Sequence, residues 1–289
     1  MSRKALGGRG RLAAAVAVVS LAGAGLAVVV AGGSPSSAPD CGLERSDEAT
    51  KSCYAESYLG LLRRASGTDA GVARITRVSR QRPGPARCHV IMHTVGQRWA
   101  RNRGLGLRDL AGALPRSRDD GCASGFAHGL ITAMAPQIDV TDPQAAVRRG
   151  CARIRVTYER LHCVHGFGHA FSRIWNQQVR KAVAMCSRLA GAAEAYNCAH
   201  GALMDYWIAR AAEKRRPARR GPGSIGRVCA LGSPSLVQVC WFRATWDLHL
   251  DTPGIHTSGG SRKLCTGLEG PARRGCTAAV ALLRAQPSG

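Results

Sequence analysis

The residues in this sequence that could do chemistry are histidines placed at fixed distances from cysteines. The segment LHCVHGFGHAF (161–171) holds one cysteine, three histidines and two glycines. Within it His165 and His169 are four residues apart, and His89 and His93 repeat that spacing. On a helix each pair lies on one face, one turn apart, so its two imidazoles point into the same space. Such pairs are typical ligands of transition-metal ions.

Three further candidates fall in register with these when each segment is aligned on its cysteine. Counted from the cysteine, His200 stands at +2 like His165, and His128 stands at +6 like His169. Asp205 adds a carboxylate at +7 in the segment of His200. We therefore predict one metal site with these candidate ligands: His89, His93, His128, His165, His169, His200 and Asp205.

Zinc and copper match this set of donors, and haem held by two axial histidines is the less favoured option. The aligned positions also read as helix starts, where the helix dipole favours the neutral imidazole that binds metals. A catalytic site would keep an open coordination position, with Asp205 or Asp247 nearby as a proton carrier. The sequence leaves open whether the protein is an enzyme.

A second interpretation of the same segments is purely structural. Gly125, Gly166 and Gly201 would let a neighbouring helix approach closely, and the histidines at +2 would cap helix N–H groups. The outermost segments argue for a functional role, because those at Cys53 and Cys276 keep the cysteine and lack the histidine. Both interpretations stay open at this point.

The cysteines indicate which elements position the histidines. An even number of cysteines in an exported chain is typical of disulfide bonds. Ten of the twelve form local pairs that are eleven or twelve residues apart: Cys41 with Cys53, Cys151 with Cys163, Cys186 with Cys198, Cys229 with Cys240 and Cys265 with Cys276. Cys88 and Cys122 lack local partners but occupy equivalent positions of adjacent segments. We predict a sixth bond between them, with free thiols as the alternative.

The second cysteines of the local pairs, together with Cys88 and Cys122, recur every 34–42 residues. This is the period of stacked helical hairpins. We therefore predict an all-α fold of disulfide-stapled helical-hairpin repeats, an α-solenoid of about seven repeats. Each local bond would join the end of one helix to the start of the next. In one repeat Thr141 is the expected N-cap, and Pro143 lies in the first helical turn.

The N-terminal region has the pattern of an export segment. Four basic residues precede an uncharged apolar run over about residues 12–33, which is followed by small residues and prolines. We predict that residues 1–38 are an export signal or a signal-anchor helix, the single membrane segment of the chain. Residues 39–289 would then form an extracytoplasmic, cysteine-rich helical-repeat domain, membrane-anchored or secreted.

The charge of the chain bears on its partners. It carries 41 Lys and Arg against 18 Asp and Glu, a formal net charge of +23. Without the four basic residues of 1–38, the remainder keeps 37 basic and 18 acidic residues, a net charge of +19. Nucleic acid is not expected outside the membrane, whereas anionic wall polymer and lipid headgroups are present there. The alternative to a metal-binding protein is therefore a non-catalytic binding or structural module of the cell surface, for such a polymer or for a partner protein.

Overall fold

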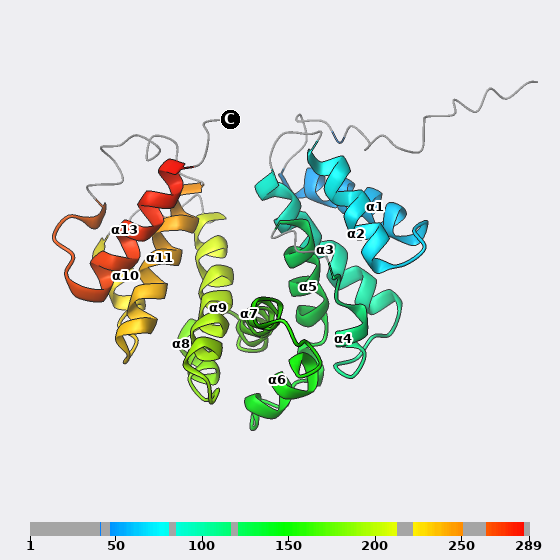
Figure 1. Ribbon diagram of the computed structural model, residues 1–289. Coiled ribbons are helices and arrows are strands. Elements are labelled where there is room, and N and C mark those ends of the chain that lie inside the picture. The colour runs from blue at the N-terminus through cyan, green and yellow to red at the C-terminus, as the bar shows by residue number, and fades with distance from the viewer. Residues whose placement is uncertain are drawn as a thin grey trace, which may run out of the picture. The chain divides into compact units, whose positions relative to one another are not determined.

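The computed structural model describes Cys41 and residues 47–80, 85–116, 121–212, 222–250 and 264–285, all within the unit 38–289 (Figure 1). The predicted export segment lies outside these residues. Over the described ranges the chain forms twelve α-helices and one 3-10 helix, without a β-strand, which confirms the all-α prediction. No helix in this part of the chain is both long and apolar enough to cross a membrane.

Seven helices each contain one cysteine of the aligned series. They are α1 (Asp47–Arg63), α3 (Pro85–Asn102), α5 (Cys122–Ala133), α7 (Thr157–Ile174), α9 (Ala192–Ala212), α11 (Pro234–Leu250) and α13 (Gly270–Ala285). Between them in the chain stand α2 (Thr68–Arg80), α4 (Leu110–Ala113), η1 (Ala135–Gln137), α6 (Pro143–Cys151), α8 (Val179–Cys186) and α10 (Pro222–Val228). Each of the seven packs against the next, so α7 lies between α5 and α9 (Figure 1). The solenoid of seven repeats stays a prediction.

All twelve cysteines form disulfide bonds, as predicted from their spacing. Five bonds join the local pairs: Cys41 to Cys53, Cys151 to Cys163, Cys186 to Cys198, Cys229 to Cys240 and Cys265 to Cys276. The sixth joins Cys88 to Cys122, and no cysteine is free. Six disulfides indicate an oxidising, extracytoplasmic environment.

The predicted helix ends are only partly correct. Cys151 and Cys186 end their short helices, as expected. The second cysteine of a local pair, however, is not at a helix start, although Cys122 does begin α5: α7 begins six residues before Cys163, and α11 begins six residues before Cys240. These two cysteines therefore lie inside their helices, and each bond joins the end of one helix to the second turn of the next.

The predicted N-cap of α6 is also wrong by one residue. The side chain of Asp142, not that of Thr141, accepts the hydrogen bond from the backbone N–H of Ala145 at 2.8 Å. Thr141 instead contacts Asp139, to which both its backbone N–H and its hydroxyl donate. Pro143 does lie in the first turn of α6, as expected.

Peptide mapping without reduction provides a direct check on the disulfide pairing. Digestion of the oxidised protein should release linked peptides for all six bonds, and alkylation before digestion should label no cysteine. The bond between Cys88 and Cys122 is the informative one, because it joins α3 to α5 and is the only bond between cysteine-bearing helices of the aligned series. Alkylated Cys88 and Cys122 in the native protein would contradict the structure and favour the free-thiol alternative.

Glycines set how closely the cysteine-bearing helices pack. A Cβ atom on Gly125 or Gly129 of α5 would lie 2.2 Å from the backbone oxygen of His89 or His93 on α3. A Cβ atom on Gly201 of α9 would lie 2.1 Å from the backbone oxygen of His165 on α7. Since real Cβ atoms do not approach so closely, only glycine allows these contacts. The predicted close approach is thus confirmed at Gly125 and Gly201, and it presses histidine-bearing helices together.

The third predicted glycine, Gly166, has a different neighbourhood. A Cβ atom there would lie 2.5 Å from the side chain of Ile131 on α5 rather than against backbone. Around these contacts the core is filled by large buried side chains, among them Phe126, Phe167 and Trp207. Helix α7 therefore contacts α9 through backbone and α5 through side chains. The histidines of α5 and α7 meet across this second interface.

Candidate metal centre

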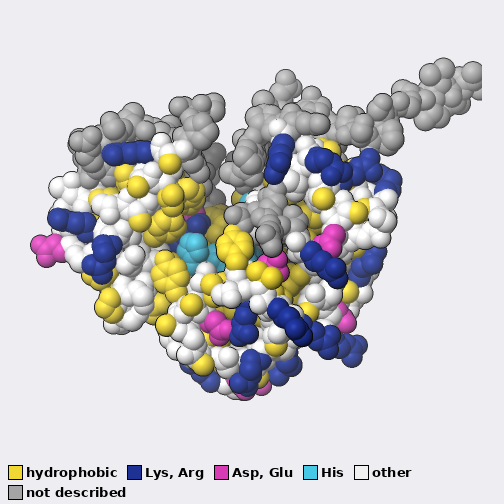
Figure 2. All heavy atoms as spheres, viewed as in Figure 1, with side chains coloured by type: hydrophobic (Ala, Val, Ile, Leu, Met, Phe, Trp, Pro, Cys, Tyr) yellow, Lys and Arg dark blue, Asp and Glu magenta, His cyan; other side chains and the backbone are white. Residues whose placement is uncertain are grey.

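Six histidines from four consecutive cysteine-bearing helices meet in one cluster. Helix α3 contributes His89 and His93, α5 contributes His128, α7 contributes His165 and His169, and α9 contributes His200. The ring centroids of contacting pairs are 4.5–5.3 Å apart. Histidine side chains are visible near the centre of the face in Figure 2, among hydrophobic side chains. The structure therefore brings all six predicted histidines together.

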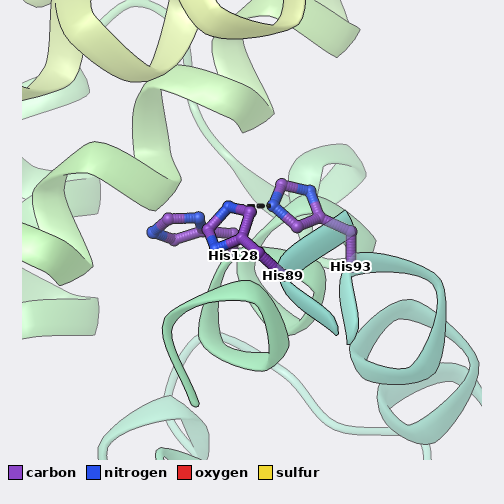
Figure 3. A group of neighbouring side chains, drawn as sticks. All are labelled: His89, His93 and His128. Carbon is purple, nitrogen blue, oxygen red and sulfur yellow. Dashed lines mark hydrogen bonds between the residues drawn. The ribbon is translucent and has the colours of Figure 1, made fainter. Parts of the chain in front are cut away.

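Within the cluster, two triads have the spacing of metal ligands. Nitrogens of His89, His93 and His128 lie within 4.8 Å of one another, and so do nitrogens of His128, His165 and His169. Figure 3 shows the first triad with its rings turned toward one another; the dashed line joins the Nε2 atoms of His89 and His93, 3.1 Å apart. Metal–nitrogen bonds of 2.0–2.1 Å place two tetrahedral ligand atoms about 3.3 Å apart. This pair is already at ligand spacing.

Two of the rings are held in place by hydrogen bonds at their Nδ1 atoms. Nδ1 of His89 lies 3.2 Å from the backbone oxygen of Gly121 and 3.1 Å from Oγ of Ser124, so it carries the proton. Nδ1 of His169 donates to Oδ1 of Asp205 at 2.8 Å. In the neutral form of each ring the lone pair is then on Nε2. Nε2 of His89 lies 3.1 Å from Nε2 of His93, and Nε2 of His169 is buried. Histidine ligands of metal ions are commonly oriented in this way by a carbonyl or carboxylate.

Several ring nitrogens are buried and have no hydrogen-bond partner among the residues that the structure describes. They are Nδ1 and Nε2 of His128, Nε2 of His165, Nε2 of His169 and Nε2 of His200. Most buried polar atoms in folded proteins have a partner, and leaving one unpaired costs about 1–3 kcal/mol. Their concentration in one cluster provides several nitrogen atoms that a metal ion could bind.

Burial disfavours the charged form of five of the six histidines. Burial first, and then the charge that neighbouring His169 would carry, lower the pKa of His89 to about 4. Burial also lowers the pKa values of four other histidines well below 6.5, namely His93, His128, His165 and His200. The neutral form was predicted correctly, but its cause was not: the rings lie inside helices rather than at their starts, so desolvation and not the helix dipole is responsible.

A buried ion pair next to the cluster was missed by the sequence analysis. Nε of Arg243 on α11 donates to Oδ2 of Asp247 at 2.9 Å, and a second guanidinium nitrogen contacts Oδ1. Both side chains are almost fully buried. Burial raises the pKa of Asp247 to about 7 against the opposing effect of Arg243, and after burial the charge of Arg243 is the next cause of the lowered pKa of His200. The four-residue spacing on one helix was the available signal.

Two predicted ligands have other places in the site. Asp205 belongs to neither triad and instead holds the ring of His169. His200 also lies outside both triads, with its ring edge-on to His165 at 4.9 Å. A pocket opens beside the cluster at His162, and its lining includes three arginines, Arg116, Arg153 and Arg155.

No family model matches this chain, and neither the curated proteins nor the solved structures contain a match to it. Its function must therefore be argued from the site itself.

Proposed function

We propose that this disulfide-rich helical protein binds a transition-metal ion, Zn²⁺ or Cu²⁺, through its histidine cluster. The observation that carries the proposal is the set of buried ring nitrogens that converge without a hydrogen-bond partner in the described part of the chain. Neutral imidazoles bind metals without first losing a proton, so the lowered pKa values favour binding at neutral pH. The oriented rings of His89 and His169 support the same function.

The donor set narrows the choice of metal. Imidazole nitrogens suit zinc, copper, iron and nickel, and no thiolate competes because every cysteine is in a disulfide. Haem fits less well, because the histidine rings contact one another directly. The rings of His93 and His169, for example, meet edge to face with centroids 4.9 Å apart. A porphyrin between axial ligands would need these contacts to open.

The structural interpretation of the histidines is less well supported. If the histidines were packing residues, each ring N–H group would donate a hydrogen bond to a backbone carbonyl. If they were helix caps, they would lie in the first helical turn. His89 has a carbonyl partner, but His128, His165 and His200 each have a buried nitrogen that no partner reaches within the described ranges. Capping does not apply inside a helix. Without a metal ion, the unpaired nitrogens of the cluster lower the stability of the folded protein. Binding of a metal ion would restore that stability.

The decisive experiment compares His169→Ala with the wild type purified without a nickel column. Wild-type protein should carry metal in elemental analysis and bind added Zn²⁺ in calorimetry. Loss of groups that merely orient a ligand costs 10–100-fold in affinity, so loss of His169 itself should weaken Zn²⁺ binding at its own triad (His128, His165 and His169) by about 100-fold or more. Circular dichroism and disulfide content should stay unchanged, because the other contacts of α7 remain.

His162→Ala is the matched control, since His162 lies on the same helix but belongs to neither triad. It should bind Zn²⁺ like the wild type. The proposal would be refuted if the wild-type protein were purified without metal and bound neither added Zn²⁺ nor added Cu²⁺. It would also be refuted by a His169→Ala variant that loses about 1–3 kcal/mol of stability and still binds as many ions, as tightly, as the wild type, since that is the behaviour of a packing residue.

We further propose an anionic partner in the cell envelope, a wall polymer or lipid headgroups. The support is the net charge of +23, the prominence of Lys and Arg over Asp and Glu on the face in Figure 2, and the arginine-lined pocket beside His162. Binding of this kind is electrostatic and should weaken steeply with added salt. Co-sedimentation with anionic and neutral vesicles at low and high salt tests it.

A further inference from the structure

His128 belongs to both triads, and this shared residue is relevant to the number of metal ions that the cluster can hold. The ligand atoms fall into two sets of three, one formed with α3 and one with α7. An ion with bonds of 2.0–2.1 Å needs all its ligand atoms within about 4 Å of one another. Over the described residues even the wider limit of 4.8 Å groups these ligand atoms only in threes, and the five histidines of the triads do not form one set. A single ion would therefore leave two of them unused.

The shared residue, His128, has the least satisfied side chain of the cluster. Its residue is 2% exposed, and no hydrogen-bond acceptor or donor within the described ranges reaches Nδ1 or Nε2. A neutral imidazole carries one N–H group and one lone pair, so one ion could satisfy only the lone pair. The buried N–H would still lack an acceptor, at a cost of about 1–3 kcal/mol. Two ions would satisfy both atoms.

Each triad also contains one ring that is already fixed by its Nδ1 atom. In the first triad Gly121 and Ser124 hold His89, and in the second Asp205 holds His169. Orientation of one ligand per triad is what two separate ions require. A single ion would need only one such anchor, and the second would have no role.

We propose that the cluster is a two-metal centre in which the ring of His128 bridges the ions. This inference rests on the proposed metal binding and deepens it. One ion is bound by His89, His93 and one nitrogen of His128, and the other by His165, His169 and the second nitrogen. The ring gives up its N–H proton to solvent, and a metal–nitrogen bond forms at each of its two nitrogens. Three protein ligands leave a fourth position open on each ion.

Ion counting and magnetic coupling together test this arrangement. Native mass spectrometry of metal-free protein titrated with Zn²⁺ should show two ions per chain. His93→Ala and His165→Ala each break one triad and spare the other, so each should retain a single ion. His162→Ala is again the control and should bind two. With Cu²⁺ at two ions per chain, coupling through the ring should reduce the integrated electron-spin signal well below that of two independent ions.

The outcomes separate this inference from the proposed function. Saturation of the wild type at one ion per chain would overturn the two-metal centre and leave metal binding intact. Two Cu²⁺ ions with the full signal of independent spins would overturn the bridge. No binding of either ion would overturn both proposals. Two coupled ions in the wild type, together with one uncoupled ion in His93→Ala and in His165→Ala, is the result that supports the inference.

Discussion

Acidification from pH 7 to pH 5 should unfold the metal-free protein. In the folded state, burial lowers the pKa values of five cluster histidines: His89, His93, His128, His165 and His200. In the unfolded chain the same rings have a pKa near 6.5 and take up protons below it. The unfolded state thus binds more protons, so stability is fully present above pH 6.5 and is lost as the pH falls.

The size of this effect follows from proton linkage. A histidine that stays neutral in the folded state lowers the free energy of unfolding by about 1.9 kcal/mol between pH 7 and pH 5, and five give about 9 kcal/mol. Asp247 acts in the opposite direction: its pKa is raised to about 7, so the folded state takes up a proton on acidification. That offsets about 2 kcal/mol, and the net loss of about 7 kcal/mol is comparable with the whole stability of many domains.

Far-UV circular dichroism and tryptophan fluorescence of chelator-treated protein would follow the transition. His200→Gln removes one titrating ring and should move the midpoint to lower pH. Added Zn²⁺ should protect the wild type until protons displace the metal. An acid transition that has the same midpoint in wild type and His200→Gln would show that the buried histidines do not govern it.

The disulfide pairing and the position of the histidines along their helices could be predicted from the sequence, because both depend on local spacing. Pairs of cysteines eleven or twelve residues apart have few alternatives, and a shared offset from the cysteine places His128 and His169 at one height on adjacent helices. The structure contains the predicted disulfides and brings the histidines together. The meeting of the histidines could therefore be predicted although the predicted helix ends were partly wrong.

Helix boundaries and tertiary partners could not be obtained in the same way. Thr157 starts α7 six residues before Cys163, and nothing in the local pattern distinguishes that first turn from a loop. Asp205 was assigned to the metal because its offset resembles that of a ligand, but the packing of α9 on α7 places its carboxylate on Nδ1 of His169. The contact of two particular atoms depends on how helices cross, which a single sequence does not specify.

Gly168→Ala should separate α7 from α9 and weaken both the fold and the metal site. A Cβ atom on Gly168 would lie 1.9 Å from the backbone oxygen of Cys198 and 2.7 Å from the backbone nitrogen of Ala202. Backbone atoms cannot move aside as a flexible side chain can, so the helices must part by roughly 1 Å or more to restore an ordinary contact distance. Overpacking of a core commonly costs 1–3 kcal/mol, and a clash with backbone should cost roughly 3 kcal/mol or more.

The same displacement reaches the metal site through one hydrogen bond. Nδ1 of His169 on α7 and Oδ1 of Asp205 on α9 are 2.8 Å apart, so a shift of about 1 Å breaks their contact. His169 would lose its fixed orientation, and Zn²⁺ affinity should fall by about 10–100-fold. Asp205→Asn should reproduce the loss of affinity while leaving the urea midpoint near that of the wild type.

Gly112→Ala is the matched control for the glycine substitution. Gly112 lies in α4, and a Cβ atom there would meet nothing within 4 Å. Alanine is the better helix former by about 1 kcal/mol, so this variant should be as stable as the wild type or slightly more stable. Urea denaturation of the oxidised proteins and Zn²⁺ calorimetry should be carried out on four proteins: the wild type, Gly168→Ala, Asp205→Asn and Gly112→Ala. If Gly168→Ala matched Gly112→Ala in both measurements, the close packing of α7 on α9 would not be what positions the histidines.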